Sequence, residues 1–288
     1  MLSSAPVDGI LLVDKDPGKT SHDIVAEVRL ALDERRAGHT GTLDPAATGL
    51  LVVALGRALK MVPYHEGHDK EYAVTVLLGV RTDTDDAAGR ELERRDASGI
   101  TREAVESALA RFRGAIRQRP PAYSAVKVDG ERAYRLARRG EAVEIPEREV
   151  TIHEIRIDGF EPPRVRLVLR GSKGTYVRSI ARDLGDALGC GGSVADLRRV
   201  AVGPFRVDGA IRLDRAGEAE LRRAILSPDA GLDHLPAVQL DAGEARRFTQ
   251  GKLLDQGSPA PLVRIYEGST FIGIGEEKDQ RLKARRVY

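Results

Sequence analysis

One aspartate, Asp44, lies in a segment with an unusual composition for a surface turn. Residues 38–51 read Gly-His-Thr-Gly-Thr-Leu-Asp-Pro-Ala-Ala-Thr-Gly-Leu-Leu, with three glycines, three threonines and almost no long side chain. Because Pro45 disfavours a helical conformation at the residue before it, we expect Asp44 on a rigid loop and Pro45 near the first turn of a following helix. A carboxylate held there could attack an electrophilic carbon or transfer a proton. An Asp-Pro turn without chemistry is the alternative.

A second residue that needs an explanation is Arg178. Apolar residues recur at helical spacing from Val177 to Leu188, and Gly189 follows where a C-terminal cap belongs. Arg178 falls in the first turn of this predicted helix beside its apolar stripe, where an unpaired cation is costly. It therefore needs an anion, and Asp44 is the candidate. Such a partner is expected to lower the pKa of the carboxyl group by roughly 1–3 units and keep it ionised.

Composition and charge set the class of protein that must position these residues. The 288 residues are 41% hydrophobic and 31% charged, which predicts a globular chain with one large and one small domain. The single cysteine, Cys190, rules out an internal disulfide and fits a reducing cytoplasm. The first residues do not read as an export signal, and no apolar run approaches the ~18 residues that span a membrane. We expect a cytoplasmic protein without a membrane segment.

Hydrophobic patterning predicts the elements around Asp44. Residues 9–14 form a short apolar run, typical of a buried strand, and Thr20 with Asp23 resembles a capping box that opens a helix. Residues 50–60 are densely apolar and predict a helix. Apolar side chains alternate from Tyr72 to Leu78, as do those of residues 164–170, so both segments predict strands with one buried face.

Two polar clusters resemble metal sites but fit the pattern poorly. His65 and His68 have ligand-like spacing without a cysteine partner, so a surface loop is the expectation. Residues 79–89 carry Asp83, Asp85 and Asp86, yet the alternation of a calcium loop breaks at Ala87, which favours a structural turn. The chain also lacks a phosphate loop and a dinucleotide fingerprint. We therefore expect neither a metal nor a cofactor.

Basic side chains gather between Arg111 and Arg139, although the net charge is only +2. A short helix is predicted over 131–139, with Arg132, Arg135 and Arg139 on one face. This face could be simply solvated or could contact nucleic acid. Beyond residues 233–236, which read as a linker, a short helix and short strands near 262–266 and 271–275 predict a small β-barrel.

Five ordered motifs resemble those of the TruB family of pseudouridine synthases, which act on uridine 55 of bacterial tRNA. The resemblance spans nearly all of residues 9–288. The matching segments are 14–21 around Lys15, 38–51 around Asp44, Lys70-Glu71-Tyr72 with the turn at 79–89, 120–134 with Pro-Pro-x-Tyr-Ser-Ala-x-Lys, and 172–185 with Leu197-Arg198-Arg199. Asp16 stands where the family usually has a proline, which is a departure from the family pattern in that turn.

The resemblance implies an architecture. It predicts an α+β catalytic domain over residues 1–232, with a mixed β-sheet, flanking helices and a mobile thumb near residues 126–149. A PUA-type RNA-binding domain over 233–288 follows. The implied reaction isomerises uridine 55 in the T loop of tRNA to pseudouridine without a cofactor. It cleaves and re-forms the glycosidic bond on a flipped-out base, and the enzyme is expected to act as a monomer without an obligatory protein partner.

The resemblance also implies roles for individual residues. Asp44 would be the catalytic carboxylate, acting on the sugar or base or removing a ribose proton, and Arg178 would pair with it. Tyr72 would stack on the uracil, a contact worth about 1–3 kcal/mol, and could relay the C5 proton. The remaining residues are His39, which would fill the gap left by the flipped base; Tyr176, Leu197 and Lys15, which would bind the substrate; and Lys127, Arg132, Arg135 and Arg139, which would contact the RNA backbone.

Three alternatives remain open at this stage. A guide-RNA-directed, dyskerin-like relative shares the Thr-Leu-Asp-Pro core and would need partner proteins. An RNA-folding protein would keep its function without the carboxylate of Asp44. A nucleoside hydrolase would release free uracil, but that chemistry works with two acidic residues, and here only Asp44 has a motif around it.

Overall fold

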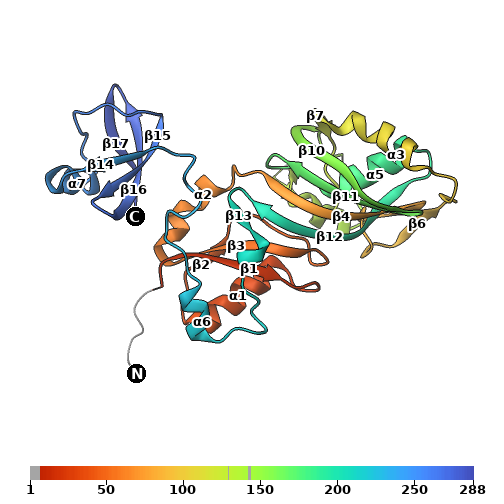
Figure 1. Ribbon diagram of the computed structural model, residues 1–288, viewed down its shortest axis with the longest axis horizontal. Helices are drawn as coiled ribbons and strands as arrows, with labels where there is room; N and C mark the ends of the chain where they lie inside the picture. The colour runs from red at the N-terminus through yellow and green to blue at the C-terminus, as the bar shows by residue number, and fades with distance from the viewer. Residues whose placement is uncertain (1–6, 129, 142–143) are drawn as a thin grey trace.

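The computed structural model describes residues 7–128, 130–141 and 144–288. The molecule is elongated, with a large mixed sheet and its helices in the body and a small β-sheet with one helix at the end that carries the C-terminus (Figure 1). The predicted α+β class, with a mixed sheet followed by a small β unit, is confirmed.

The large sheet has nine strands, seven of them in the order β1-β3-β12-β4-β11-β10-β7. β2 pairs with β3, and β13 pairs with β12. All of these pairings are antiparallel except that between β12 and β3. The strands are β1 (Gly9–Lys15), β2 (Ala37–His39), β3 (Thr48–Leu55), β4 (Lys70–Leu78), β7 (Gly114–Gln118), β10 (Arg148–Glu161), β11 (Arg164–Gly171), β12 (Gly192–Val202) and β13 (Phe205–Arg206).

Helices cover this sheet at both ends. The helical elements are α1 (Ser21–Leu32), η1 (Gly56–Met61), α2 (Val62–His65), α3 (Arg102–Leu109), η2 (Ala110–Phe112), α4 (Ala133–Arg138), α5 (Val177–Ala187), η3 (Val207–Gly209) and α6 (Glu218–Arg223). The apolar stripe of α5 packs with α3 on β4, β11 and β10, whereas α1 and α6 pack on β1 and β3. The predicted capping box at Thr20 is present, and Gly189 adopts φ +75° just after α5, as expected for a C-terminal cap.

The helix predicted over residues 50–60 is wrong. Residues 48–55 form strand β3, and only Gly56–Met61 turn helically, as the 3₁₀ segment η1. β3 lies between β1 and β12 and is buried on both faces, so its sequence is an unbroken apolar run without the alternation of a half-buried strand. The helix expected to begin near Pro45 is also absent, because a tight turn at 45–46 leads directly into β3.

Two further local expectations need correction. His65 is not in a surface loop: it is 1% exposed, at the end of α2, with its ring 5.6 Å from that of His68. His234 packs against His68 in turn, at 5.1 Å. The predicted helix over 131–139 is shorter, because residues 131–132 form strand β9 (Glu131–Arg132), which pairs with β8 (Lys127–Val128) before α4 begins. The turn at 79–89 leads from β5 (Val80–Thr82) toward β6 (Glu91–Arg94), as a structural turn should.

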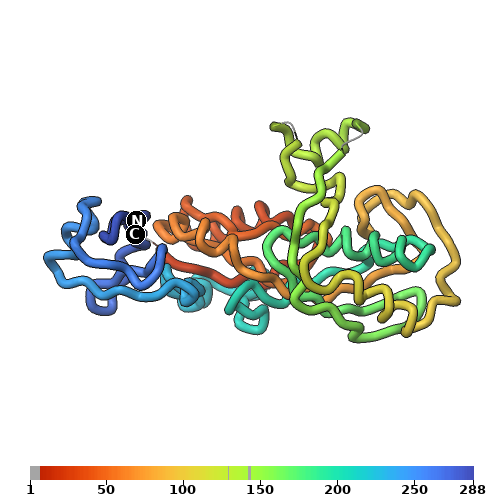
Figure 2. The backbone as a smooth tube through the Cα atoms, turned by 90° about the horizontal axis from the view of Figure 1, so that it is seen from above, coloured from red at the N-terminus to blue at the C-terminus, as the bar shows by residue number. Residues whose placement is uncertain are grey.

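The segment predicted as a thumb, residues 126–149, projects from the body of the molecule (Figure 2). β8, β9 and α4 form its folded part, and residues 129, 142 and 143 lie outside the described residues. The segment returns to the body at the start of β10.

The C-terminal part has its own sheet, in the order β14-β15-β16-β17, with helix α7 packed against it. Its elements are β14 (Ala237–Leu240), α7 (Ala242–Thr249), β15 (Leu262–Glu267), β16 (Thr270–Lys278) and β17 (Arg281–Val287). A second apolar cluster joins Phe271 and Ile274 of β16 to Met61 and Tyr64, so this sheet is packed onto the body through a shared core. Within the described residues, no helix is long and apolar enough to cross a membrane.

Candidate active site

Asp44 lies at the start of a tight turn between β2 and β3. The backbone N–H of Ala47 donates to the Asp44 carbonyl oxygen at 3.1 Å, with Pro45 at the second position of the turn, where its fixed φ is favourable. The backbone N–H of Gly18 donates to the Pro45 carbonyl oxygen at 2.8 Å. The aspartate is thus on a rigid loop, as expected, but the rigidity comes from a β-turn and not from a helix.

The Lys15 ammonium group fixes this turn through hydrogen bonds to its backbone. Its side chain is 1% exposed, and its ammonium group donates to the carbonyl oxygens of Asp16, Pro45 and Ala47 at 2.8, 3.0 and 2.7 Å. All three hydrogens of the ammonium group are therefore used within the protein. Lys15 positions the loop, and the structure does not present it as a group free to bind substrate.

Arg178 reaches Asp44 from the first turn of α5. Its Nη2 donates to Oδ1 of Asp44 at 3.2 Å, and its Nε lies 3.0 Å from Oδ2. The same guanidinium donates to the carbonyl oxygens of Thr84 and Tyr123, each at 2.9 Å. The ion pair expected from the sequence is present, between residues 134 positions apart in the chain.

Asp86 is a residue of this site that the sequence reasoning missed. Its Oδ2 lies 3.6 Å from Nη1 of Arg178, and its Oδ1 accepts hydrogen bonds from the Thr84 hydroxyl and the Ala88 N–H. Arg178 therefore bridges two carboxylates. The neighbouring Asp85 pairs with Arg182 of α5 at 3.0 Å. The acidic turn thus faces the basic side chains of α5. The Thr-Asp-Thr-x-Asp string of residues 82–86 was the signal in the sequence from which Asp86 could have been found.

The pKa of Asp44 departs from the sequence-based expectation. Burial raises the pKa of this carboxyl group above its ordinary value, and the Asp86 carboxylate adds to the rise, while Arg178 and Lys15 oppose it. The side chain keeps 37% of its surface exposed, which limits how far either influence can extend. Arg178 lowers the pKa of Asp44, as expected, but desolvation and a second carboxylate outweigh the guanidinium, so the pKa lies above its ordinary value.

A cavity of about 30 Å³ opens beside the ion pair. Its lining residues are Asp44, Ala46, Ala47, Asp86, Ala87, Arg178, Val194, Ala195 and Leu197. Leu197 is at the pocket, as predicted. This is far smaller than the roughly 150 Å³ of an engineered cavity that holds benzene, so a pyrimidine ring would need the small side chains around it to move apart.

The other residues expected at the pocket lie around it without lining the cavity. Tyr72 is 9% exposed, with its side chain in the core beneath α5, and is the cross-strand partner of Arg199. Tyr176 precedes α5, where Gln118 bonds both its N–H and its carbonyl group. His39 ends β2, and its ring Nδ1 is buried without a hydrogen-bond partner in the described part of the chain.

Arg199 was also missed as a site residue. It is 3% exposed, and its guanidinium donates to the carbonyl oxygens of Gly41, Thr42 and Leu50 at 3.0, 3.1 and 2.8 Å. These acceptors flank Asp44 on both sides. The adjacent Arg198 points elsewhere and pairs with Asp14 through two contacts of 2.8 and 2.9 Å.

The four predicted RNA-contacting residues are not equivalent. Lys127 and Arg135 are exposed on the thumb, whereas Arg132 donates to the Ala125 carbonyl oxygen at 2.7 Å. Arg139 pairs with Glu131 at 2.6 and 3.0 Å and with Glu141 at 2.6 Å. Arg139 therefore fastens the thumb together, although its side chain remains half-exposed.

Residues 119–123, just before the thumb and here called the thumb root, are hydrogen-bonded to helix α5. The Tyr123 carbonyl oxygen accepts from Arg178, and the Arg119 carbonyl oxygen accepts from the Ser179 hydroxyl at 2.8 Å and from Arg182 at 3.0 Å. One nitrogen, Nη2 of Arg178, thus contacts both the thumb root and Asp44. Arg178 therefore links the segment that precedes the thumb to Asp44 through hydrogen bonds.

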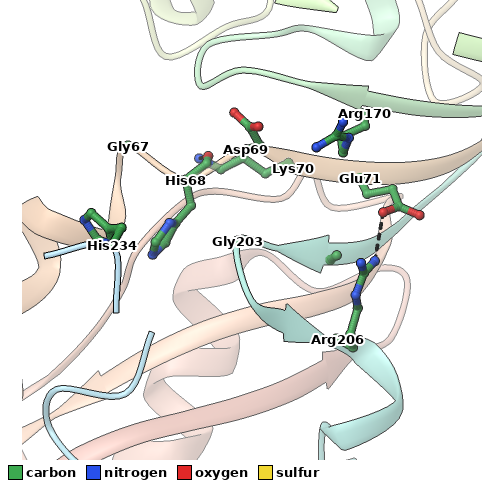
Figure 3. A pocket seen from close by; sticks show the side chains of 10 residues that line it. Gly67, His68, Asp69, Lys70, Glu71, Arg170, Gly203, Arg206 and His234 are labelled. Atoms are coloured by element: carbon green, nitrogen blue, oxygen red, sulfur yellow. Dashed lines mark hydrogen bonds and ion pairs between the residues drawn. The ribbon is translucent and has the colours of Figure 1, made fainter. Parts of the chain in front are cut away.

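A larger cavity, of about 440 Å³, lies near the junction with the C-terminal part and holds none of the predicted site residues. His68, Lys70, Arg170, Arg206 and His234 are among its walls, and Figure 3 shows Arg206 directed at Glu71. Volume alone would favour this cavity, or another of about 440 Å³ lined by Arg111 and Asp183, but neither is lined by Asp44 or Arg178. Among the described residues, no three histidine, cysteine or carboxylate side chains are grouped to hold a metal ion.

Comparison with known proteins gives this fold and site a class. The chain is similar over 98% of its length to the solved structure "Crystal Structure of a Cbf5-Nop10-Gar1 Complex", with a TM-score of 0.74, 25% identity and 85% of that chain covered. It is similar over 97% to "Structure of H/ACA RNP bound to a substrate RNA containing 2'-deoxyuridine", with a TM-score of 0.73, 24% identity and 84% covered. Three family descriptions match the sequence in order: "TruB family pseudouridylate synthase (N terminal domain)" over residues 29–177, "tRNA pseudouridylate synthase B C-terminal domain" over 178–233 and "Pseudouridine synthase II TruB, C-terminal" over 236–288. The fold and the family matches are thus those of a pseudouridine synthase, an isomerase.

The chain belongs to the TruB family of pseudouridylate synthases. It is 46% identical over 274 residues to the tRNA pseudouridine synthase B of Aromatoleum aromaticum, covering 94% of this chain and 89% of that protein. It is 41% identical to the protein of the same name from Xanthomonas campestris pv. campestris, covering 98% of this chain and 94% of that one. The family resemblance inferred from the sequence is confirmed.

Proposed function

We propose that this enzyme converts uridine 55 in the T loop of tRNA to pseudouridine. The observation that carries the proposal is the Asp44–Arg178 ion pair beside a small cavity, in a chain whose relatives bear the name tRNA pseudouridine synthase B. The substrate is a tRNA stem-loop in the cytoplasm, and the chain acts as a monomer without an obligatory protein partner.

The reaction breaks the bond between N1 of uracil and C1′ of ribose, turns the base and joins C5 to C1′. The proton leaves C5 and N1 gains one, so atoms and charge balance without an oxidant or reductant. Asp44 is the catalytic carboxylate, as nucleophile or as the base that removes a ribose proton. Arg178 favours its ionised form against the burial and the Asp86 charge that raise its pKa. Tyr72 stacks on the base and relays the C5 proton.

Because the cavity is small and the target base must leave its stack, RNA binding must offset the free-energy cost of both changes. Extruding a paired or stacked base costs a few kcal/mol, which contacts elsewhere on the RNA must offset. Lys127 and Arg135 of the thumb supply phosphate contacts, and His39 fills the space vacated by the base. Entry of the base then separates Leu197 from the small residues opposite it. The C-terminal sheet, residues 233–288, acts as a PUA-type RNA-binding domain.

The test is to expose an unmodified transcript of the tRNA T stem-loop to the purified protein and map pseudouridine by chemical labelling. We expect modification at position 55 by the wild-type chain and none by Asp44→Asn, with RNA affinity nearly unchanged. Free uracil as the product would instead identify a hydrolase. Activity retained by Asp44→Asn would reject the proposed catalytic role.

One second function has an observation in its favour. The chain shares its fold with a chain of a solved Cbf5-Nop10-Gar1 complex, which favours action within an assembly. The same assay separates the two: modification of the transcript by the purified chain alone supports the stand-alone enzyme. Inactivity that is relieved only by added proteins or a guide RNA would favour the assembly.

A further inference from the structure

Arg199 lies on β12, between the strand that carries Tyr72 and the strand that follows the Asp44 loop. On β12 its cross-strand partner is Tyr72 on one side and Gly49 on the other. β4, which carries Tyr72, and β3, which follows the Asp44 loop, are thus both registered on this single residue. Gly49 lets β3 come this close, because a Cβ there, at φ +98°, would lie 2.2 Å from the Arg199 carbonyl oxygen.

The side chain of Arg199 repeats this connection on the Asp44 loop. Two of its nitrogens bond the carbonyl oxygens of Gly41 and Thr42 before Asp44, and Nε bonds that of Leu50 after it. The planar guanidinium presents these donors in a fixed fork, so the two ends of the loop are held in one geometry. A lysine could not make all three bonds in the same directions.

The charge of Arg199 is an additional feature that backbone anchoring does not require. Its three acceptors are neutral carbonyl groups, and burial lowers the pKa of the guanidinium while Tyr72 and Asp44 oppose that change. The positive charge of Arg199 also affects three other groups. Burial lowers the pKa values of Lys15, His39 and Lys70, and repulsion from Arg199 lowers them further. A buried cation favours the ionised form of acidic groups near it.

We propose that Arg199 is a positioning residue of the isomerisation, which fixes the Asp44 loop relative to Tyr72 through its three hydrogen bonds and its place between β3 and β4. The inference rests on the proposed function, in which these two side chains act on the base. The fork of hydrogen bonds and the buried positive charge of Arg199 can be varied separately by substitution.

Two substitutions separate these effects. Arg199→Lys keeps the charge and loses the fork, whereas Arg199→Met keeps a long side chain and loses both. Arg198→Met is the matched control, since Arg198 is the next residue on β12 and pairs with Asp14 away from the loop. For each variant we would measure kcat and KM on the T stem-loop transcript from pH 5 to 9, together with the thermal midpoint and RNA affinity.

We expect both Arg199 variants to lose about 100-fold in kcat, the scale of a displacement of about 1 Å, with KM changed by less than about threefold. In Arg199→Met alone, the acid limb of the pH profile moves to higher pH, because a cation that favours the Asp44 carboxylate is gone. Arg198→Met stays within about threefold of the wild type, in line with a surface change away from the site.

Three outcomes would overturn the inference. These are a folded Arg199→Met with wild-type kcat, a loss confined to KM or to the thermal midpoint, and an acid limb that stays in place in that variant. If Arg199→Met does not fold, Arg199→Lys decides, because a wild-type kcat there removes the positioning role. A wild-type protein that forms no pseudouridine in this assay would instead refute the proposed function, so the two failures are distinguishable.

Discussion

The ion pair between Asp44 and Arg178 makes a prediction that joins stability to activity. Arg178→Met removes a guanidinium that contacts two carboxylates and two backbone carbonyl groups. Asp44 is then left beside Asp86, with Lys15 and Arg199 as the remaining cations that oppose the burial that raises its pKa. Loss of an adjacent cation of this kind raises the pKa of an aspartate by roughly 1–3 units.

The magnitude follows from burial on the two sides of the pair. Breaking a fully buried pair costs about 3–5 kcal/mol, but Asp44 is 37% exposed, so solvent reduces the loss to about 1–3 kcal/mol. The lost bonds to Thr84 and Tyr123 leave two carbonyl groups with water as a partner, or with none. With about 2–4 °C for each kcal/mol in a chain of this size class, the thermal midpoint should fall by roughly 2–12 °C at neutral pH.

The sign of the pH dependence can be worked out from the same groups. The folded-state pKa of Asp44 lies above its unfolded value in the wild type and rises further in Arg178→Met. A carboxyl group with a raised pKa costs stability where it is ionised, and that cost disappears as the pH falls through the folded pKa. The deficit of the variant is therefore largest at neutral pH and shrinks in acid.

The assay pairs single-turnover rates on the T stem-loop transcript from pH 5 to 9 with melting curves at neutral and acid pH. We expect the acid limb of the rate profile to move upward by roughly 1–3 units in Arg178→Met, with RNA affinity little changed. Arg182→Met is a useful control, because it removes a neighbouring guanidinium that pairs with Asp85 instead. An unshifted acid limb, or a melting deficit that persists undiminished in acid, would refute the reasoning.

Three further predictions address other charged groups, one beside Asp44 and two on the thumb. Asp86→Asn should move the acid limb to lower pH, opposite to Arg178→Met, because the Asp86 charge raises the pKa of Asp44; a shift in the other direction in the same profile would contradict this. Arg135→Gln should reduce the slope of log affinity against log salt by about 1, as expected for a lost phosphate contact. Arg139→Gln should instead affect the thumb itself, since Arg139 is held by Glu131, and a slope change as large as that of Arg135→Gln would count against this assignment.

Local sequence was sufficient for elements whose signals are carried within a few residues. The capping box at Thr20, the cap at Gly189 and the alternation from Tyr72 to Leu78 each depend on neighbouring side chains, and each appears in the structure where expected. The need of Arg178 for an anion was also readable, because its place beside an apolar stripe implied burial.

Other features depend on packing between distant segments and were out of reach. A continuous apolar run does not reveal whether it is a helix or a strand covered on both faces, so β3 was mistaken for a helix. Burial of His65 depends on a segment far away in the chain, because the Phe205 ring lies 6.2 Å from the His65 ring. The roles of Lys15 and Arg139 likewise depend on which acceptors the fold brings within reach.

The amino-acid sequence by itself was sufficient to recognise the family, because its ordered motifs resemble those of the family. It was also sufficient to pair Arg178 with Asp44, because a cation beside an apolar stripe needs an anion. Only the tertiary structure decided the electrostatics of that pair. Asp86, Lys15 and Arg199 approach Asp44 from different strands and turns, and the pKa of a carboxyl group is the sum of desolvation and of every nearby charge. That sum depends on three-dimensional distances between segments that are remote from one another in the chain.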